Sequence, residues 1–317
     1  NNNISNFYYT NNNRLLSKSP KLSKFSDNKN YSNRAVLFFD NNLISYDHKG
    51  TIFVYSTDSR KKTFYYNFYK KNFKNFEKEL YLLVDNNILY TADNLGYLYA
   101  INLSTKSLLW AKNYGIPFRS NLKLANNQLF LANQDNVIYS VNTKTGDKNW
   151  QFATSLTFLN SDFYNNSAID EINNNLLFLN TNGELYSINY LDQKVNWVLN
   201  FKSRSLAGDT DLFLSQPLTI KNDNLVLSTE EAIFNYSHLN ATRKWTFRLK
   251  PVLKPVSTLN HVFILGKNNL LICLDIESGE VIWSKNIYKE IDNKKITKKI
   301  GKFYDLKIVN GKINLYS

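Results

Sequence analysis

A chain of 317 residues is long enough for one large all-β domain or two ordinary domains, and a hydrophobic content of 43% can fill a real core. Aromatic residues make up 15% of the chain, with 21 Tyr and 21 Phe, which favours strands over helices. The single cysteine, Cys273, excludes a disulfide framework and a paired-cysteine metal site. No stretch approaches the roughly 18 consecutive apolar residues of a membrane-spanning helix.

The formal net charge of +13 permits two interpretations. A basic surface can bind nucleic acid or an anionic membrane. The same charge can also follow from an AT-biased genome, because Asn, Lys, Ile, Tyr and Phe are all abundant and Met is absent. Most lysines are scattered through expected turns, apart from the lysine-rich segment Lys289–Lys302. We favour the compositional interpretation and expect no nucleic-acid partner.

The chain opens with a polar, Asn-rich segment, residues 1–33, that carries only weak strand signals. It begins NNNISNFYY, with neither Met nor a signal-like stretch, which indicates a processed or trimmed product. We interpret it as a separate segment that supplies at most one strand to the domain that follows, residues 34–317.

Six copies of one pattern follow, each of which closes on a Trp or Phe at a fixed offset of 14 positions. The copies run from Gly50 to Phe64, Gly96 to Trp110, Asn136 to Trp150, Gly183 to Trp197, Glu231 to Trp245 and Asn269 to Trp283. A turn pair and an alternating apolar run precede each copy, such as NNILYT from Asn86. Paired Asn suits a tight hairpin turn because Asn tolerates positive φ. Each unit is therefore predicted to hold four short strands.

The spacing of the copies identifies the architecture. Successive tryptophans from Trp110 to Trp283 are 40, 47, 48 and 38 residues apart, and such periods with four strands are typical of propeller blades. A helical solenoid fails because the apolar residues alternate with period two. Two more strands in KFYDLKIVNGKINLYS, at the end of the chain, begin a seventh unit. We predict an all-β propeller of seven or eight four-stranded antiparallel blades, incomplete at its C-terminal end.

The copies end on a motif that resembles the docking motif of the PQQ-like propeller repeat, roughly A-x-D-x-x-T-G-x-x-x-W. The best matches are SVNTKTGDKNW, Ser140–Trp150, and CLDIESGEVIW, Cys273–Trp283. The small first residue is expected to permit close approach to the neighbouring blade, the Gly to suit a turn, and the Trp to supply a flat contact. We assign this structural, blade-docking role to Phe64, Trp110, Trp150, Trp197, Trp245, Trp283, Gly146 and Gly279.

This resemblance implies one of two functions. Quinoprotein dehydrogenases of the repeat family bind pyrroloquinoline quinone and calcium, are much longer, and carry an adjacent cysteine pair that this chain cannot have. The other branch, led by BamB, consists of non-catalytic scaffolds. The composition, with IPFRSNLK at Ile116–Lys123 and NNLLICLD at Asn268–Asp275, is similar in style to BamB-like proteins of AT-rich marine alphaproteobacteria. We therefore expect no enzyme activity, no cofactor and no metal site.

The BamB-like resemblance further implies a periplasmic protein at the inner face of the outer membrane, acting in β-barrel protein assembly with a BamA-like partner. A monomer is expected, touching the membrane only through a lipid anchor outside this sequence. A PQQ-binding or ligand-sensing propeller stays open as the alternative. An intracellular WD-type hub is disfavoured because no copy has Asp after its Trp.

The connection FKSRSLAGDTDLFLSQP, Phe201–Pro217, is longer than its counterparts and mixes charged with apolar residues, which is typical of a binding loop. The resemblance places a BamA-docking region here, and the alternative is an insertion packed on its own propeller. The candidate partner-binding residues are Arg204, Leu206, Asp209, Asp211, Leu212 and Phe213. The three histidines, His48, His238 and His261, lie in or beside expected turns, where solvated side chains are the favoured interpretation.

Overall fold

The computed structural model describes residues 36–70, 72–73, 75–155, 166–201, 213, 215, 217–229, 231–289, 302–309 and 311–316. Most of them lie in strands or in the turns that join strands. The chain divides into two compact units, Arg14–Tyr164 and a second formed by Asn165–Ser317 with Asn1–Asn13. The segment at residues 1–33 lies outside the described residues.

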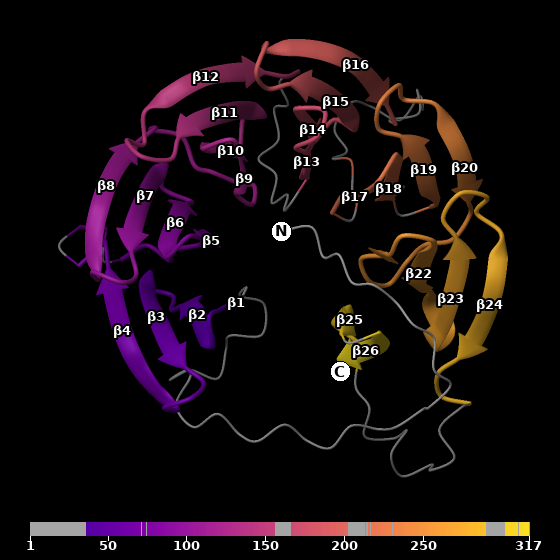
Figure 1. Cartoon of the computed structure of the whole chain (residues 1–317), viewed down its shortest axis with the longest axis horizontal. Coiled ribbons are helices and arrows are strands. Elements are labelled where there is room, and N and C mark those ends of the chain that lie inside the picture. The colour runs from indigo at the N-terminus through magenta and orange to yellow at the C-terminus, as the bar shows by residue number, and fades with distance from the viewer. Residues whose placement is uncertain are drawn as a thin grey trace. The chain divides into compact units, whose positions relative to one another are not determined.

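The unit Arg14–Tyr164 holds three antiparallel sheets, each of four strands in sequence order (Figure 1). They are β1 (Leu37–Phe39), β2 (Asn42–Tyr46), β3 (Thr51–Ser56) and β4 (Lys61–Asn67); β5 (Leu80–Asp85), β6 (Ile88–Asp93), β7 (Tyr97–Asn102) and β8 (Ser107–Asn113); and β9 (Lys123–Ala125), β10 (Gln128–Ala132), β11 (Val137–Asn142) and β12 (Lys148–Ala153).

The second unit repeats this organisation three times and adds a two-stranded sheet. Its strands are β13 (Ser167–Asp170), β14 (Asn175–Leu179), β15 (Glu184–Asn189) and β16 (Lys194–Asn200); β17 (Thr219–Lys221), β18 (Asn224–Ser228), β19 (Ile233–Ser237) and β20 (Arg243–Phe247); β21 (Val256–Ser257), β22 (His261–Leu265), β23 (Leu270–Asp275) and β24 (Val281–Asn286); and β25 (Asp305–Val309) and β26 (Lys312–Tyr316).

Within each unit the first strands of consecutive sheets lie against one another, as β1 does with β5 and β13 with β17. Each sheet is therefore a propeller blade, and the predicted β-propeller fold is confirmed. The described residues hold six complete blades and a two-stranded seventh, which is consistent with six or seven blades. An eighth sheet, the upper alternative from the sequence, is not among them.

The first two strands of a blade are joined by the tight turns that the Asn pairs predicted. Both central residues have positive φ at Asn86 (45°) and Asn87 (62°), and again at Asn126 (47°) and Asn127 (58°). This is the conformation of a type I′ turn, whose twist matches that of the flanking strands. Asn adopts it at low cost because its short polar side chain tolerates the left-handed region.

The second and third strands are joined by a turn that an Asp or Asn side chain organises. Asp93 Oδ1 accepts hydrogen bonds from the backbone N–H groups of Leu95 and Tyr97, both at 2.8 Å. Asn133 does the same for Asp135 and Val137, both at 3.0 Å. Such Asx turns satisfy backbone donors locally and fix where the third strand begins.

The third and fourth strands share one irregularity in all six complete blades. The register shifts directly after the residue that pairs with the blade's terminal aromatic residue, for example after Ala100, which lies opposite Trp110. The corresponding pairs are Val54–Phe64, Ser140–Trp150, Ser187–Trp197, Asn235–Trp245 and Cys273–Trp283. The small first residue of the motif is thus the cross-strand partner of its own Trp. Ala100 also lies in the apolar cluster between the second and third blades, which is compatible with the expected close approach of the neighbouring blade.

Candidate functional site at the blade junctions

Three tryptophans reach from the fourth strand of their own blade to the next blade along the chain. The indole Nε1 of Trp110 donates to the carbonyl oxygen of Thr143 at 2.9 Å, and that of Trp245 donates to Ile276 at 2.8 Å. Trp197 donates to His238 at 3.2 Å. Every acceptor is the first residue after the third strand of the following blade. The indole N–H therefore finds a partner, and the ring covers the next blade's turn.

The motif glycines lie directly beneath these rings. A Cβ on Gly146 would come within 2.4 Å of Trp110 Cε3, and one on Gly279 within 2.6 Å of Trp245 Cγ. Both glycines also have a φ of +73°, a region that side chains rarely adopt. Two independent constraints, backbone conformation and contact with Trp, therefore select Gly here.

Other residues hold the same backbone conformation where the motif lacks Gly. Ala241 has a φ of 62°, and its turn receives Trp197. This junction has the longest of the three indole hydrogen bonds, and Trp197 is only half-buried, whereas Trp110 and Trp245 are buried. Lys106, with a φ of 59°, faces the first blade, where it donates through Nζ to the carbonyl of Thr63, beside Phe64, at 3.2 Å. A junction without Gly is therefore looser or uses a different contact.

The remaining aromatic residues of the motif have other surroundings. Phe64 packs, half-buried, in the apolar cluster that fills the space between the first and second blades. Trp150 is buried beside Phe130, with their ring centroids 6.0 Å apart. Trp283 joins Phe303 and Leu306 in the cluster that connects the sixth blade to the two-stranded sheet.

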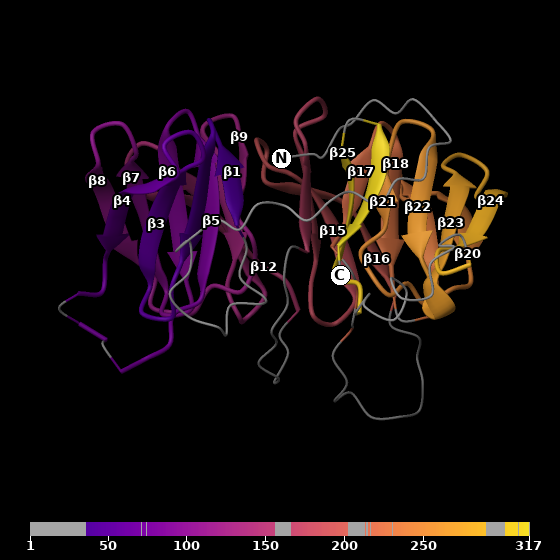
Figure 2. The ribbon, with the colours of Figure 1, turned by 90° about the horizontal axis from the view of Figure 1, so that it is seen from below.

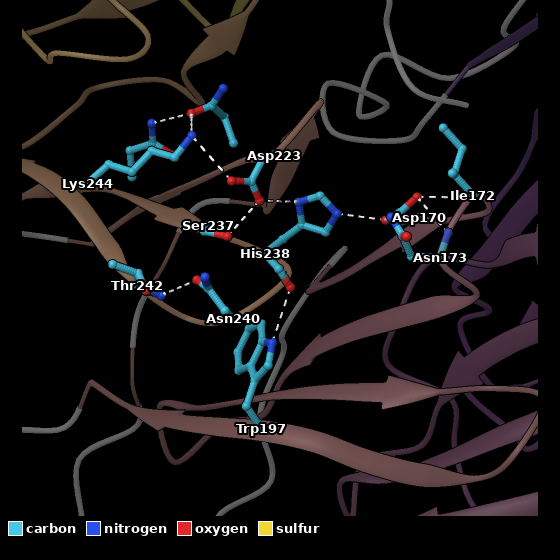
Figure 3. A network of polar contacts seen from close by, with 12 residues as sticks. Asp170, Ile172, Asn173, Trp197, Asp223, Ser237, His238, Asn240, Thr242 and Lys244 are labelled. Atoms are coloured by element: carbon cyan, nitrogen blue, oxygen red, sulfur yellow. Dashed lines mark hydrogen bonds and ion pairs between the residues drawn. The ribbon is translucent and has the colours of Figure 1, made fainter.

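A polar network runs across the two junctions of the second unit that Trp197 and Trp245 also join (Figure 3). His238 Nε2 lies 2.7 Å from Oδ2 of Asp170, which belongs to the preceding blade. On the other side of the imidazole, Nδ1 lies 3.7 Å from Asp223 Oδ1. Lys244 continues the network, since its Nζ lies 3.6 Å from Asp223 and 3.0 Å from Glu277 of the following blade. Three consecutive blades are thus joined through charged side chains.

The electrostatics of this network follow from burial and hydrogen bonding. Burial raises the pKa of Asp170, but hydrogen bonds from Asn173 and His238 outweigh it and hold that pKa below its ordinary value. Asp170 is therefore an ionised acceptor, and His238 donates to it through Nε2. Hydrogen bonds from Asn224 and Lys244 likewise lower the pKa of Glu277.

The expectation of solvated histidines is wrong for His238. Only 3% of its side chain is exposed. The imidazole lies between two carboxyl groups, and the backbone carbonyl accepts a hydrogen bond from the indole of Trp197. His48 is exposed, as expected, and His261 is half-buried at the start of β22. The repeat could have located His238 at a junction, because it occupies the motif position that supplies every indole acceptor. Asp170 could not have been found, since no sequence pattern links it to a residue 68 positions away.

The first unit has a buried polar cluster of its own. The hydroxyl of Tyr69 donates to Oδ2 of Asp93, a carboxyl group with no exposed surface. Burial raises the pKa of Asp93, although hydrogen bonds from Tyr69 and from the backbone act in the opposite direction. Asp93 also accepts the hydrogen bonds that organise the turn between β6 and β7, so we assign it a structural role.

Of the six candidate partner-binding residues, Phe213 alone lies among the described residues. Phe213 lies with Phe201 at a centroid distance of 6.1 Å, within the apolar cluster of the fourth and fifth blades, and its N–H donates to Thr181 at 2.9 Å. Its ring therefore packs against its own unit. Arg204, Leu206, Asp209, Asp211 and Leu212 lie outside the described residues.

No group of three or more His, Cys, Asp or Glu side chains that could hold a metal ion occurs in the part of the chain that the structure describes. Cys273 is buried, and burial raises the pKa of its thiol to about 11. None of the described segments is a helix with the length and apolar character needed to cross a membrane.

Comparison with known proteins identifies the relatives of this chain. The family model described as outer membrane protein assembly factor BamB matches residues 71–285. Proteins of that name from Moranella endobia and Yersinia pestis are 22% and 21% identical to it, over 76% and 62% of this chain. The chain spans 62% and 51% of the lengths of these two relatives.

Solved structures show the same fold. The crystal structure of BamB from Moraxella catarrhalis aligns with a TM-score of 0.65 at 12% identity, covering 80% of this chain and 75% of that one. A computationally designed protein, Ika8, aligns with a TM-score of 0.61 at 13% identity, covering 80% of this chain and 73% of the design. Because the family model matches most of its length, the chain belongs to the BamB family of PQQ-like β-propellers.

Proposed function

We propose that this chain is a non-catalytic scaffold of outer-membrane β-barrel protein assembly that acts in the periplasm. The observation that carries the proposal is the match of residues 71–285 to the family of outer membrane protein assembly factor BamB. Relatives that bear the same name add support. A BamA-like barrel-assembly protein is the partner that this function implies.

The use of polar side chains at the junctions supports a scaffold. The indoles, the motif glycines and the network around His238 all join one blade to the next. Such contacts rigidify a propeller, and a rigid framework positions the loops that bind a partner. Asp170 and His238 form the kind of pair that catalysis uses, but only 9% and 3% of their side chains are exposed, so a substrate would have little access.

We place the partner-binding surface on the connection between β16 and β17, at Arg204, Leu206, Asp209, Asp211 and Leu212. Phe213 is the anchor of this connection, because it packs beside Phe201 and bonds to Thr181.

Capture experiments with the periplasmic part of the BamA-like protein from the same organism test both levels of the proposal. Arg204→Glu with Leu206→Ser is expected to weaken binding about tenfold or more, the size of a hot-spot loss. Leu191→Ser, at a turn residue that is 50% exposed, is the control and should bind like the wild type. Unchanged binding of the double variant rejects this surface. A wild-type protein that fails to bind, or that fractionates outside the periplasm, rejects the function.

A further inference from the structure

The connection between β4 and β5, residues 68–79, exposes two phenylalanine side chains. Phe73 is 40% exposed and Phe76 is 60% exposed, and among the described residues only Phe38 is a comparably exposed phenylalanine. Figure 2 shows this connection projecting beyond the ends of the strands of its unit. Soluble surfaces rarely present neighbouring aromatic rings on a projection without a binding role.

A buried lysine fixes the backbone that carries the two rings, and the ring of Phe73 also packs edge to face against Tyr97 at a centroid distance of 5.9 Å. Lys78 is 1% exposed, and its ammonium group donates to the backbone carbonyl oxygens of both Phe73 and Phe76. The same ammonium lies 5.4 Å from the ring centre of Tyr69, which is itself buried. Burial lowers the pKa of Lys78, so its placement carries a desolvation cost, which these contacts and the charges of Asp47 and Asp93 offset.

The backbone at the tip is fixed in an unfavourable conformation. Phe73 has a φ of 57°, a region in which a bulky side chain is an outlier. The N–H of Phe76 closes the turn on the carbonyl of Phe73 at 3.2 Å, and the two rings meet edge to face with centroids 6.4 Å apart. The side chain of Asn94 ties down the end of this loop, because it donates a hydrogen bond to Glu77 O at 3.1 Å and accepts one from Glu79 N at 3.0 Å. The exposed rings are therefore a built feature of the loop.

The charge around the rings is mostly positive, although the exposed Glu77 directly follows Phe76. The segment FYKKNFKNF, residues 68–76, contains three lysines and no acidic residue. Lys70 is exposed, and so is Lys49 in the adjoining turn. The backbone carbonyl of Lys49 accepts a hydrogen bond from Asn67 Nδ2 at 3.3 Å. Apolar rings flanked by lysines suit a bilayer surface, where the rings enter the headgroup boundary and the ammonium groups meet anionic lipids.

We propose that residues 68–79 form a peripheral membrane contact that inserts Phe73 and Phe76 into the surface of a bilayer containing anionic lipids. A protein interface normally buries about 800 Å² on each partner, which a narrow projection with two rings does not offer by itself. A bilayer yields around a convex tip and needs no complementary pocket. This contact is a route to the membrane through residues of this chain itself, and it does not depend on the partner proposed above.

A dye at the tip tests insertion directly. Asn75, which is exposed between the two rings, is replaced by Cys and labelled with an environment-sensitive fluorophore. Cys273 does not compete for the label, because it is 1% exposed and burial raises its thiol pKa to about 11. Vesicles of equal parts phosphatidylglycerol and phosphatidylcholine should shift the emission to the blue. A label on Ser104→Cys, an exposed turn residue at the other end of its blade, should not respond.

Sedimentation with the same vesicles tests the named residues. Phe73→Asn, which keeps the left-handed backbone accessible, combined with Phe76→Ser should lower the partition coefficient about tenfold. Phe38→Ser, at an exposed ring elsewhere, should leave it unchanged, and all variants should melt at the wild-type temperature. The proposal is overturned if the dye on Asn75→Cys does not respond or if the double variant binds like the wild type. Equal binding to pure phosphatidylcholine vesicles would overturn the requirement for anionic lipid.

Discussion

Trp110 lies so close over Gly146 that a single added methyl group would meet the indole at 2.4 Å. Gly146→Ala should therefore destabilise the protein by about 2–4 kcal/mol, since it combines left-handed backbone strain with overpacking against a buried ring. Urea unfolding followed by tryptophan fluorescence measures the change. A loss below about 1 kcal/mol would show that the ring moves aside freely.

At the junction of Ala241, a substitution at the motif's glycine position should raise the stability of the protein, whereas Gly146→Ala lowers it. Its φ of 62° is strained for Ala, and its turn receives Trp197 through the longest of the three indole bonds. Ala241→Gly is expected to stabilise the protein by about 0.5–1 kcal/mol, because relief of the strain exceeds the added entropy of the unfolded chain. The melting temperature should rise, and a fall would contradict the assignment of strain to this residue.

Removing one indole N–H should have unequal effects at different junctions. Trp245→Phe removes the indole donor to the carbonyl of Ile276, which keeps its hydrogen bond from the amide of Asn235, and should cost about 1–3 kcal/mol. Trp197→Phe should cost less, because this Trp is half-buried and its bond to His238 is longer. Chemical denaturation of the two variants under identical conditions gives the comparison, and equal losses would contradict it.

Acid should weaken the pair formed by Asp170 and His238. Hydrogen bonds hold the pKa of Asp170 below its unfolded value of about 3.9, so the pair stabilises the folded state fully above that pH and loses its effect as pH falls through the lowered pKa. Asp170→Asn should cost about 2 kcal/mol at neutral pH, and the difference from wild type should shrink in acid.

Unfolding free energies between neutral pH and about pH 2 measure this effect, with Asp147→Asn as the control. Asp147 also has a lowered pKa through its bond to Lys112, but its side chain is exposed. Its substitution should have a much smaller effect. A difference for Asp170→Asn that stays constant down to the lowest pH would exclude its carboxylate as the source.

The sequence could predict the blades because their third and fourth strands form a hairpin of constant length. The same bulge and the same cross-strand pair, such as Ala100 with Trp110, keep the aromatic residue 14 positions from the turn that precedes the third strand. The Asn pairs predicted the first turns for a physical reason as well, since they adopt positive φ at residues such as Asn86 and Asn87. Most of the fold could therefore be predicted, because it depends on local backbone geometry.

Most contacts between blades could not be predicted from the sequence. The burial of His238 depends on Asp170, and that of Lys78 on the carbonyls of a turn whose backbone no propensity would predict. Phe213 looked like an exposed loop residue because the sequence does not show that Phe201 lies beside it. Side chains that act between blades take their roles from packing, which a repeat pattern records only at the positions of its motif.

The indole contacts also have a direction in time. The acceptor of each indole lies further along the chain, by 33 residues for Trp110, 41 for Trp197 and 31 for Trp245. On the ribosome, a newly made blade must therefore wait, with its tryptophan unsatisfied, until the following blade has emerged. Translation would release the propeller as a series of half-finished junctions, each closed by the next segment to be synthesised.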